Sequence, residues 1–156
     1  MTRARSRETE MRTWRGEIPI RSLYTAGVAG QAFLEALKER GELVGTRCDT
    51  CRQVYVPSRL FCERCFAELT EEAEIKPEGR LVSFTICYLD RGGKRLRRPI
   101  ALALVQLDGA TTFFLHRLLD VSKPSQVRIG ARVKAVIKPK AKRKGSILDI
   151  EGFRLA

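Results

Sequence analysis

Four cysteines in two closely spaced pairs are the residues of this chain whose types and spacing most clearly indicate chemistry. Cys48 and Cys51 form one Cys-x-x-Cys pair, Cys62 and Cys65 form the other, and ten residues separate the pairs. Two thiolates on a tight turn can bind one metal ion, and two such turns complete a tetrahedral four-sulfur site. Because four protein ligands leave no position for water, the predicted site is structural and not catalytic.

Disulfide bonds and a redox site are the alternative uses of these cysteines. The chain begins with a charged run and shows no apolar segment of the kind that directs export, which predicts a cytoplasmic protein. In a reducing compartment, paired Cys-x-x-Cys motifs indicate a metal and not disulfides. A thioredoxin-like redox site needs only one pair, in a βαβ context that this sequence lacks.

The short distance between the pairs is typical of a zinc ribbon, in which two metal-binding turns, or knuckles, face each other across a small sheet. Iron is the alternative metal, since rubredoxin also binds its metal through four thiolates. Arg52 and Phe66 follow the second cysteine of each pair, where knuckles often carry glycine. We predict Zn²⁺ as the structural cofactor.

The composition describes a small and strongly basic protein. Its 156 residues suffice for one domain or two small ones, and 44% of them are apolar, which allows a modest core. The formal net charge is +12, which favours a polyanionic partner such as nucleic acid, a phosphorylated cofactor or an acidic protein face. No run approaches the roughly 20 apolar residues of a membrane span, so no membrane partner is expected.

The order of the predicted elements indicates a mainly β protein with a short N-terminal helix. Phe33, Leu34 and Leu37 share one helical face, and Gly41 is placed to end that helix. Five short strands with a longer break after the third predict a five-stranded OB-type barrel that follows the zinc ribbon. The expected strands are 81–89, 100–107, 111–118, 131–137 and 147–153, with an acidic connector at 68–78. The expected parts are a basic N-terminal arm at 1–29, an amphipathic helix at 30–42, a zinc ribbon at 43–76 and an OB-fold domain at 77–156.

The order of several short segments resembles a family of small proteins that join a rubredoxin-like zinc ribbon to an OB-fold and accompany thiolases and other acyl-CoA enzymes. The resemblance extends over about Phe33 to Phe153. The segments that carry it are Leu43–Cys48, Tyr55-Val56-Pro57, Phe61-Cys62, Leu81–Thr85, Ile100–Gly109 and Arg128-Ile129-Gly130.

The resemblance implies a non-catalytic subunit of a hetero-oligomer. Such proteins assemble with a thiolase-like partner, or sometimes with a hydratase or an aldolase, and help to bind or channel the coenzyme A thioester. The partner supplies the catalytic residues. Relatives serve β-oxidation-like routes, among them aromatic acid degradation through benzylsuccinyl-CoA, and the sequence does not select one acyl-CoA.

Two basic segments are the candidates for contacts with the phosphates of coenzyme A. We expect the first in the loop between the first two barrel strands and the second in the tip before the last strand. If the two loops converge on one face of the barrel, their arginines suit bidentate phosphate contacts. The alternative is two separate, solvated loops. The residues are Arg91, Lys94, Arg95, Arg97 and Arg98 in the first segment, and Lys138, Lys140, Lys142 and Arg143 in the second.

Catalysis and nucleic-acid binding are the competing functions. His116, the only histidine, falls in a predicted strand, and Cys87 is a small packing residue without a nearby base in the sequence, so we assign no catalytic residue. Single-stranded nucleic acid is the alternative ligand, because OB-folds bind it with a basic groove and aromatic platforms. The aromatic candidates are Phe84, Tyr88, Phe113 and Phe114.

Overall fold

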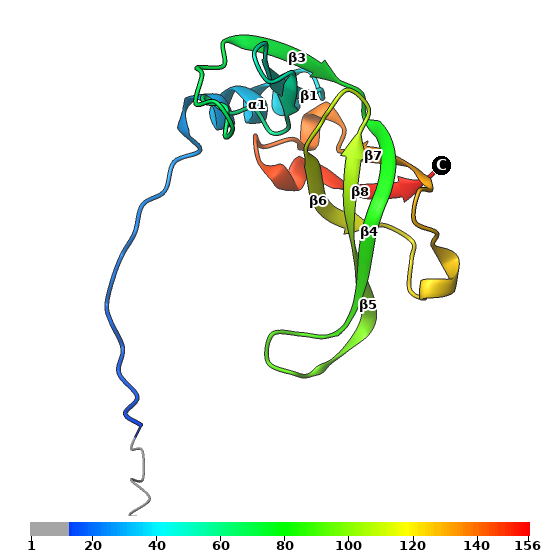
Figure 1. Cartoon of the computed structure of the whole chain (residues 1–156). Coiled ribbons are helices and arrows are strands. Elements are labelled where there is room, and N and C mark those ends of the chain that lie inside the picture. The colour runs from blue at the N-terminus through cyan, green and yellow to red at the C-terminus, as the bar shows by residue number, and fades with distance from the viewer. Residues whose placement is uncertain (1–12) are drawn as a thin grey trace, which may run out of the picture.

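The computed structural model describes residues 13–156, which form one helix, a three-stranded sheet and a closed five-stranded barrel (Figure 1). This arrangement confirms the predicted fold class. Residues 13–26 are an exposed arm without helix or strand that runs away from the body, and the first twelve residues of the predicted arm lie outside the described part. The helix is α1 (Gly27–Glu39), and the strands are β1 (Leu43–Cys48), β2 (Gln53–Tyr55), β3 (Glu71–Ile75), β4 (Glu78–Leu89), β5 (Arg95–Leu107), β6 (Phe113–Leu118), β7 (Arg132–Ile137) and β8 (Ile150–Leu155).

Helix α1 begins three residues before the expected start and ends at Glu39. Its sequence is rich in alanine, and Phe33, Ala36 and Leu37 form the buried face. Gly41 adopts a positive φ of 74° and donates its N–H to the carbonyl of Ala36. Gly41 thus forms a left-handed C-terminal cap and ends the helix, as the sequence predicted.

The three-stranded sheet has the order β2-β1-β3, with antiparallel pairing throughout. The acidic segment at 68–78, expected as a connector, instead supplies β3, which pairs with β1 from Leu43↔Ile75 to Arg47↔Glu71. Ala73 and Ile75 point into the core, while the glutamates of β3 remain exposed. β3 was not predicted because its exposed glutamates are typical of a loop and its inner face holds only two apolar side chains.

The barrel closes in the order β4-β5-β6-β8-β7, with β7 pairing back to β4 and β8 running parallel to β6. The predicted alternation in β4 is interrupted by a register shift between Leu81 and Ser83. Leu81 is therefore fully buried, and Phe84 and Ile86 resume the inward face after the irregularity. The last strand begins at Ile150 because residues Ile147–Asp149 form a 3₁₀ turn where a strand was expected.

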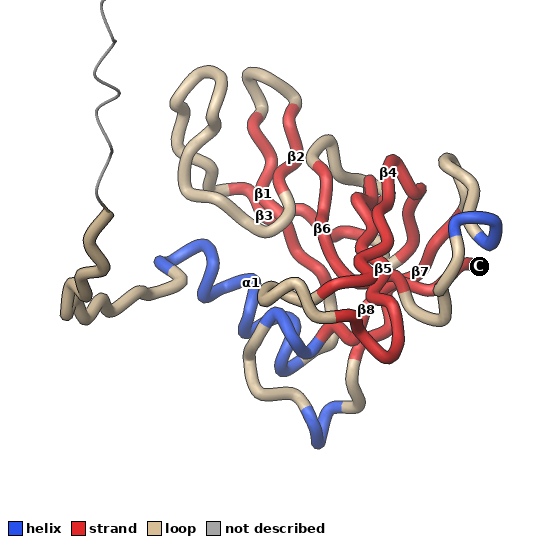
Figure 2. Tube along the Cα trace, turned by 90° about the horizontal axis from the view of Figure 1, so that it is seen from below, coloured by secondary structure: helices blue, strands red, loops and turns tan. Residues whose placement is uncertain are grey.

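One hydrophobic core joins the helix, the base of the ribbon and the barrel. Phe33 of α1 lies 6.4 Å from Phe114 of β6 between ring centroids, so the helix covers one end of the barrel. The ribbon lies beside β6 (Figure 2), where Thr111 and Thr112 accept hydrogen bonds from the backbone N–H groups of Val54 and Val56. No helix among residues 13–156 has the length and apolar content to cross a membrane.

Candidate functional site

The two knuckles bring the four thiols of Cys48, Cys51, Cys62 and Cys65 into one cluster. Their sulfur atoms all lie within 4.8 Å of one another, and the sulfurs of Cys48 and Cys65 are 3.5 Å apart. Zn–S bonds of about 2.3 Å in a tetrahedron place sulfur atoms roughly 3.8 Å apart, so the cluster has the size of a metal site. The four cysteines are therefore positioned for metal binding.

Backbone and hydroxyl groups support the sulfurs from the protein side. The N–H of Cys51 points at the sulfur of Cys48, and the N–H of Arg64 points at the sulfur of Cys62, both at 3.4 Å. The hydroxyl of Tyr55 lies 3.2 Å from the sulfur of Cys62 and accepts a hydrogen bond from the N–H of Glu63 at 3.3 Å. Tyr55 thus ties the sheet to the second knuckle.

These contacts give the thiols different pKa values. The hydrogen bond donated by Tyr55 lowers the pKa of Cys62 to about 6 and raises the pKa of Tyr55 itself to about 12. The hydrogen bond with Cys65, together with burial, raises the pKa of Cys51 to about 12. Several thiols this close resist ionising together, whereas a divalent cation at their centre favours four thiolates. The donor set therefore fits a bound metal ion.

Tyr55 is a supporting residue that the sequence reasoning missed. It is fully buried, and the guanidinium of Arg59 lies 4.9 Å from its ring centroid. The available signal was a tyrosine directly between the two knuckles, since a buried tyrosine usually finds a partner for its hydroxyl.

Two non-glycine residues occupy left-handed backbone positions in the knuckles. Arg52 has φ of 53° and Phe66 has φ of 59°, and each directly follows the second cysteine of its pair. These are the two positions where the sequence lacked the usual glycine. A side chain with a Cβ atom in this conformation costs on the order of 1 kcal/mol.

Replacing Arg52 by glycine is therefore expected to stabilise the metal-loaded protein by about 0.5–1 kcal/mol. The matched control is Arg52→Ala, which removes the same charge but keeps the Cβ atom and so gains nothing. Thermal unfolding of the two variants and the parent measures the difference. A glycine variant that unfolds no later than the alanine variant would contradict the proposed backbone cost.

The first basic segment lies largely in a strand and not in a loop. β5 begins at Arg95, so Arg95, Arg97 and Arg98 are strand residues, and only Arg91 and Lys94 remain in the turn after β4. The ladder between β4 and β5 continues to the pair Leu89↔Arg95, so β5 extends into the segment that was expected to be a loop.

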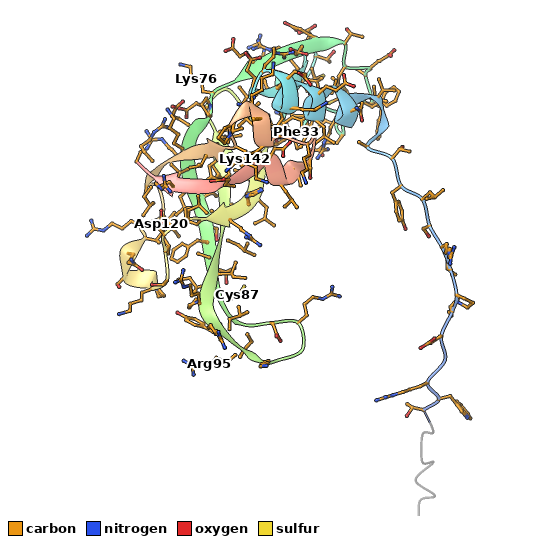
Figure 3. All side chains as sticks on the ribbon, turned by 180° about the vertical axis from the view of Figure 1, so that it is seen from behind. Phe33, Lys76, Cys87, Arg95, Asp120 and Lys142 are labelled. Carbon is orange, nitrogen blue, oxygen red and sulfur yellow. The ribbon has the colours of Figure 1, made fainter. Side chains whose placement is uncertain are left out.

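The second basic segment packs against the end of α1. Arg143 donates hydrogen bonds to the carbonyls of Lys138 and Lys38, at 2.7 and 3.3 Å, and Lys140 lies 3.7 Å from the carboxylate of Glu39. Lys142 accordingly lies on the side of Phe33, whereas Arg95 lies at the far end of the β4–β5 hairpin (Figure 3). The structure does not bring the two segments together on one face.

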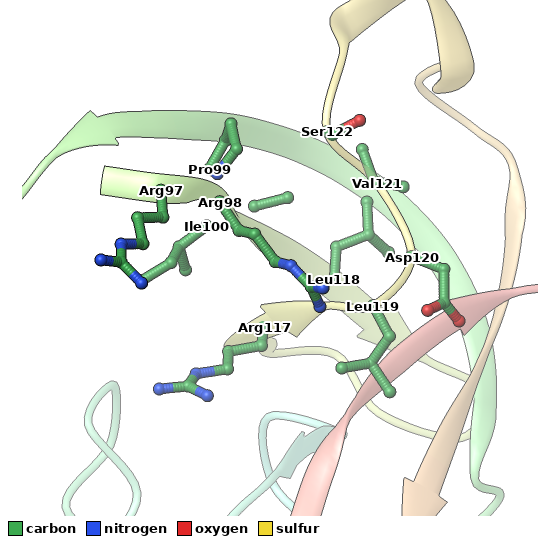
Figure 4. A pocket seen from close by; sticks show the side chains of 11 residues that line it. Arg97, Arg98, Pro99, Ile100, Arg117, Leu118, Leu119, Asp120, Val121 and Ser122 are labelled. Carbon is green, nitrogen blue, oxygen red and sulfur yellow. The ribbon is translucent and has the colours of Figure 1, made fainter. Parts of the chain in front are cut away.

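Arg97 and Arg98 instead meet Arg117 of β6, which the sequence reasoning did not single out. The three arginines line a pocket of about 490 Å³ whose apolar wall includes Ile100 and Leu119 (Figure 4). None of the three forms an ion pair with another residue among 13–156, and Asp120 at the rim is bound to Arg154 at 2.9 Å. Arg117 is a single arginine in a predicted strand, and nothing in the sequence indicated that it would join Arg97 and Arg98.

His116 and Cys87 belong neither to the thiol cluster nor to the residues that line the arginine pocket. His116 is packed between Phe114 and Phe153, and its Nδ1 atom is buried without a hydrogen-bond partner. Burial lowers the pKa of His116, which favours the neutral ring. Cys87 is partly exposed and pairs across the hairpin with Ile100.

Comparisons with known proteins agree with this architecture. Residues 36–71 match the model of the ChsH2 rubredoxin-like zinc ribbon domain, and residues 72–138 match the ChsH2 C-terminal OB-fold domain. A DUF35 domain-containing scaffold protein of Methanocaldococcus jannaschii is 29% identical over 103 residues, which cover 65% of this chain and 72% of the relative. A scaffold protein of the same description from Pyrococcus furiosus is 29% identical over 99 residues, covering 64% and 71%.

Two solved structures share the fold. A DUF35-family protein of unknown function from Sulfolobus solfataricus superposes with a TM-score of 0.62 at 28% identity, covering 83% of this chain and 84% of that one. An Ltp2-ChsH2(DUF35) aldolase superposes with a TM-score of 0.55 at 22% identity, covering 80% and 91%. With both of its domain models matched in order, the chain belongs to the family that joins a ChsH2-type rubredoxin-like zinc ribbon to a ChsH2-type OB-fold domain.

Proposed function

We propose that this chain is a non-catalytic, zinc-containing subunit that assembles with a thiolase-like enzyme and helps to hold its coenzyme A thioester. Family membership supports an accessory role, because relatives are described as scaffold proteins and a structural neighbour is described as an Ltp2-ChsH2(DUF35) aldolase. In the proposed complex, which we place in the cytoplasm, the partner carries the catalytic residues. A β-oxidation-like pathway, such as aromatic acid degradation, is the proposed setting.

The observation that carries the coenzyme A part of the proposal is the arginine pocket. Coenzyme A combines several phosphate charges with a long, weakly polar arm, and the pocket combines three arginines with apolar side chains. Arginine forms bidentate, charge-assisted hydrogen bonds with phosphate oxygens. Because Arg97, Arg98 and Arg117 have no carboxylate partner in the described chain, their guanidinium groups are available to a ligand.

The residues that we propose as phosphate contacts differ from those predicted from the sequence. Arg97 and Arg98 are retained and Arg117 is added. Arg95 lines an adjacent hollow of about 430 Å³ together with Lys123 and could contact a more distant charge of the same ligand. Arg91 and Lys94 in the turn remain secondary candidates. Lys138, Lys140, Lys142 and Arg143 lie at the end of α1, so we propose no shared site with the pocket.

Single-stranded nucleic acid is less compatible with the positions of the aromatic side chains. Phe114 is buried and Phe84 packs against the core, so neither presents a platform. Phe113 pairs with Gln106, whereas Tyr88 lies beyond the pair Cys87↔Ile100. At about 3.3 Å per residue, the two exposed rings are roughly 20 Å apart, too far for consecutive bases to stack on both.

Substitution of the pocket arginines tests the coenzyme A contact. In the complex with the native thiolase-like partner, Arg97→Ala, Arg98→Ala and Arg117→Ala are each expected to raise the KM for the acyl-CoA about tenfold, since a hydrogen bond to a charged group contributes about 1.5 kcal/mol or more. Thiolysis kinetics measures the effect, with kcat and metal content expected to stay near the parent values.

Lys142→Ala is the matched control, because it removes a positive charge from the segment that packs against the end of α1, outside the pocket. An unchanged KM for all three arginine variants would remove this pocket from the site. A partner that is fully active and stable without this chain would refute the accessory role itself. Elemental analysis of the complex from the native host should find one zinc per chain, and iron in its place would correct the metal.

A further inference from the structure

The outer surface of the barrel carries an apolar face on β5 and β6. Along β5, alternate residues point inward and are buried, among them Ala101 and Ala103. The residues between them point outward, and their neighbours on β6 continue the same surface. The residues of this β5–β6 face are Ile100, Leu102, Leu104, Phe113 and Leu115.

The strand register makes these side chains contiguous. Leu104 is paired directly with Leu115, and Gln106 is paired with Phe113. On the other side, Leu104 is opposite Ser83. A shallow hollow of about 180 Å³ lies in this surface and is lined by Leu102, Leu104 and Leu115 together with residues 83–85. The surface therefore has both an apolar centre and a shape into which a side chain of another molecule fits.

The composition of β5 is that of a strand covered on both sides. An antiparallel strand with one solvated face normally alternates apolar and polar residues, and continuous apolar runs are typical of strands buried on both faces. Residues 100–105 are such a run, yet residues 13–156 cover only the inner face. Leu115 remains 64% exposed and Phe113 52% exposed. Contiguous apolar patches of this kind mark interaction sites.

The charges at the border of the face select the kind of partner. Arg117 lies in the same register row as Leu102, and Arg98 shares a pocket with Ile100. The remaining border residues that pair with the face are neutral, among them Thr85 and Gln106. A second copy of this face would oppose arginine to arginine, and the net charge of +12 adds to that repulsion.

We infer that the β5–β6 face docks a different protein, whose contact surface is apolar at its centre and bordered by carboxylates. This inference rests on the proposed accessory function and names the surface that the partner enzyme covers. Leu104 and Leu115 fill the centre of that contact. Arg98 and Arg117 border both this face and the proposed coenzyme A pocket. Each guanidinium carries five N–H donors, so one edge can pair with a carboxylate of the partner while another edge faces a phosphate.

Charge substitutions at the centre of the face provide the test. The full, metal-loaded chain is used to isolate its partner enzyme from the native host, and the purified partner is then titrated calorimetrically. Leu115→Glu is expected to weaken binding at least about 30-fold, as for a central contact residue. Leu115→Lys should weaken binding less, because lysine loses the apolar contact but keeps the attraction to carboxylates.

Leu148→Glu is the matched control. Leu148 is 63% exposed, lies outside the face and is expected to tolerate glutamate with a change in affinity of less than about twofold. Equal affinity of the Leu115→Glu and Leu148→Glu variants would overturn the inference. So would a lysine variant that binds more weakly than the glutamate variant, since the border would then be basic.

The parent chain provides a second readout that does not depend on variants. Cys87 lies opposite Ile100 at the edge of the face, and it is the one cysteine outside the thiol cluster. Bound partner should slow the alkylation of Cys87 by N-ethylmaleimide at least about tenfold in the metal-loaded chain. The partner binds elsewhere if it leaves Cys87 unprotected and if Leu115→Glu does not change its affinity. That result would refute the inference about the β5–β6 face and leave the proposed accessory function standing.

Two further outcomes are decisive. If light scattering shows a homodimer that Leu115→Glu dissociates, a second copy is the occupant and the inference is wrong. If the chain binds no enzyme at all, the proposed accessory function fails together with the inference.

Discussion

Removal of the metal is expected to unfold the two knuckles of the ribbon, residues 48–52 and 61–69, while the barrel stays folded. Apart from the cysteines, the buried core around the knuckles consists of Tyr55 and Leu69, whereas the base of the ribbon belongs to the main core. Metal binding in small zinc modules contributes about 10 kcal/mol or more, which is largely folding free energy. Amide hydrogen exchange before and after chelation measures the loss of protection in each region.

A single cysteine substitution should reproduce this result without a chelator. Cys62→Ser removes one ligand and the partner of the Tyr55 hydroxyl, so metal content and protection at 48–52 and 61–69 should fall together. Cys87→Ser is the control, with full metal content and unchanged protection expected. Undiminished protection of residues 48–52 and 61–69 in metal-free protein would show that the thiol cluster does not hold the knuckles together.

Asp149→Ala is expected to destabilise the barrel end by about 3 kcal/mol, because it leaves three partly buried N–H groups without an acceptor. Asp149 is 1% exposed, and its Oδ2 atom accepts hydrogen bonds from the backbone N–H groups of Lys144, Gly145 and Ser146 at 2.8, 2.7 and 3.1 Å. The carboxylate thereby organises the turn that leads from the basic tip into β8. Denaturant unfolding of the metal-loaded protein measures the loss.

The pH dependence of the same variant follows from the pKa of Asp149. Burial alone would raise this pKa, but the backbone N–H donors outweigh burial and lower it. A lowered pKa in the folded state contributes stability above the ordinary value near 4, and this contribution is lost as the pH falls through the folded value. The stability gap between the parent and Asp149→Ala should therefore narrow below about pH 4.

Asp120→Asn is the control for the charge change. Asp120 is exposed, pairs with Arg154, and adopts a left-handed conformation that asparagine tolerates. Its substitution should change stability by less than about 0.5 kcal/mol. If Asp149→Ala reduced the stability as little as Asp120→Asn, the N–H groups would have found other acceptors, and the proposed role of Asp149 would be wrong.

Local patterns predicted those parts of the fold that depend on residues close in the sequence. The end of α1 at Gly41 and the convergence of the four thiols follow from a positive φ and from two short turns. β3 and the first half of β5 were missed because their composition resembles loops. Glu71 and Arg95 become strand residues because β1 and β4 offer them hydrogen-bonding partners.

The sequence by itself determined the paired thiols, the order of the elements and the excess of positive charge, because these depend on residue type and short spacing. Only the tertiary structure decided which cations meet. Antiparallel pairing of β5 with β6 brings Arg117 to Arg97 and Arg98, and packing against α1 holds Arg143 away from them. The same pairing assembles the β5–β6 face. Strand register and helix packing are long-range properties, and a one-residue shift would have pointed these side chains into the barrel.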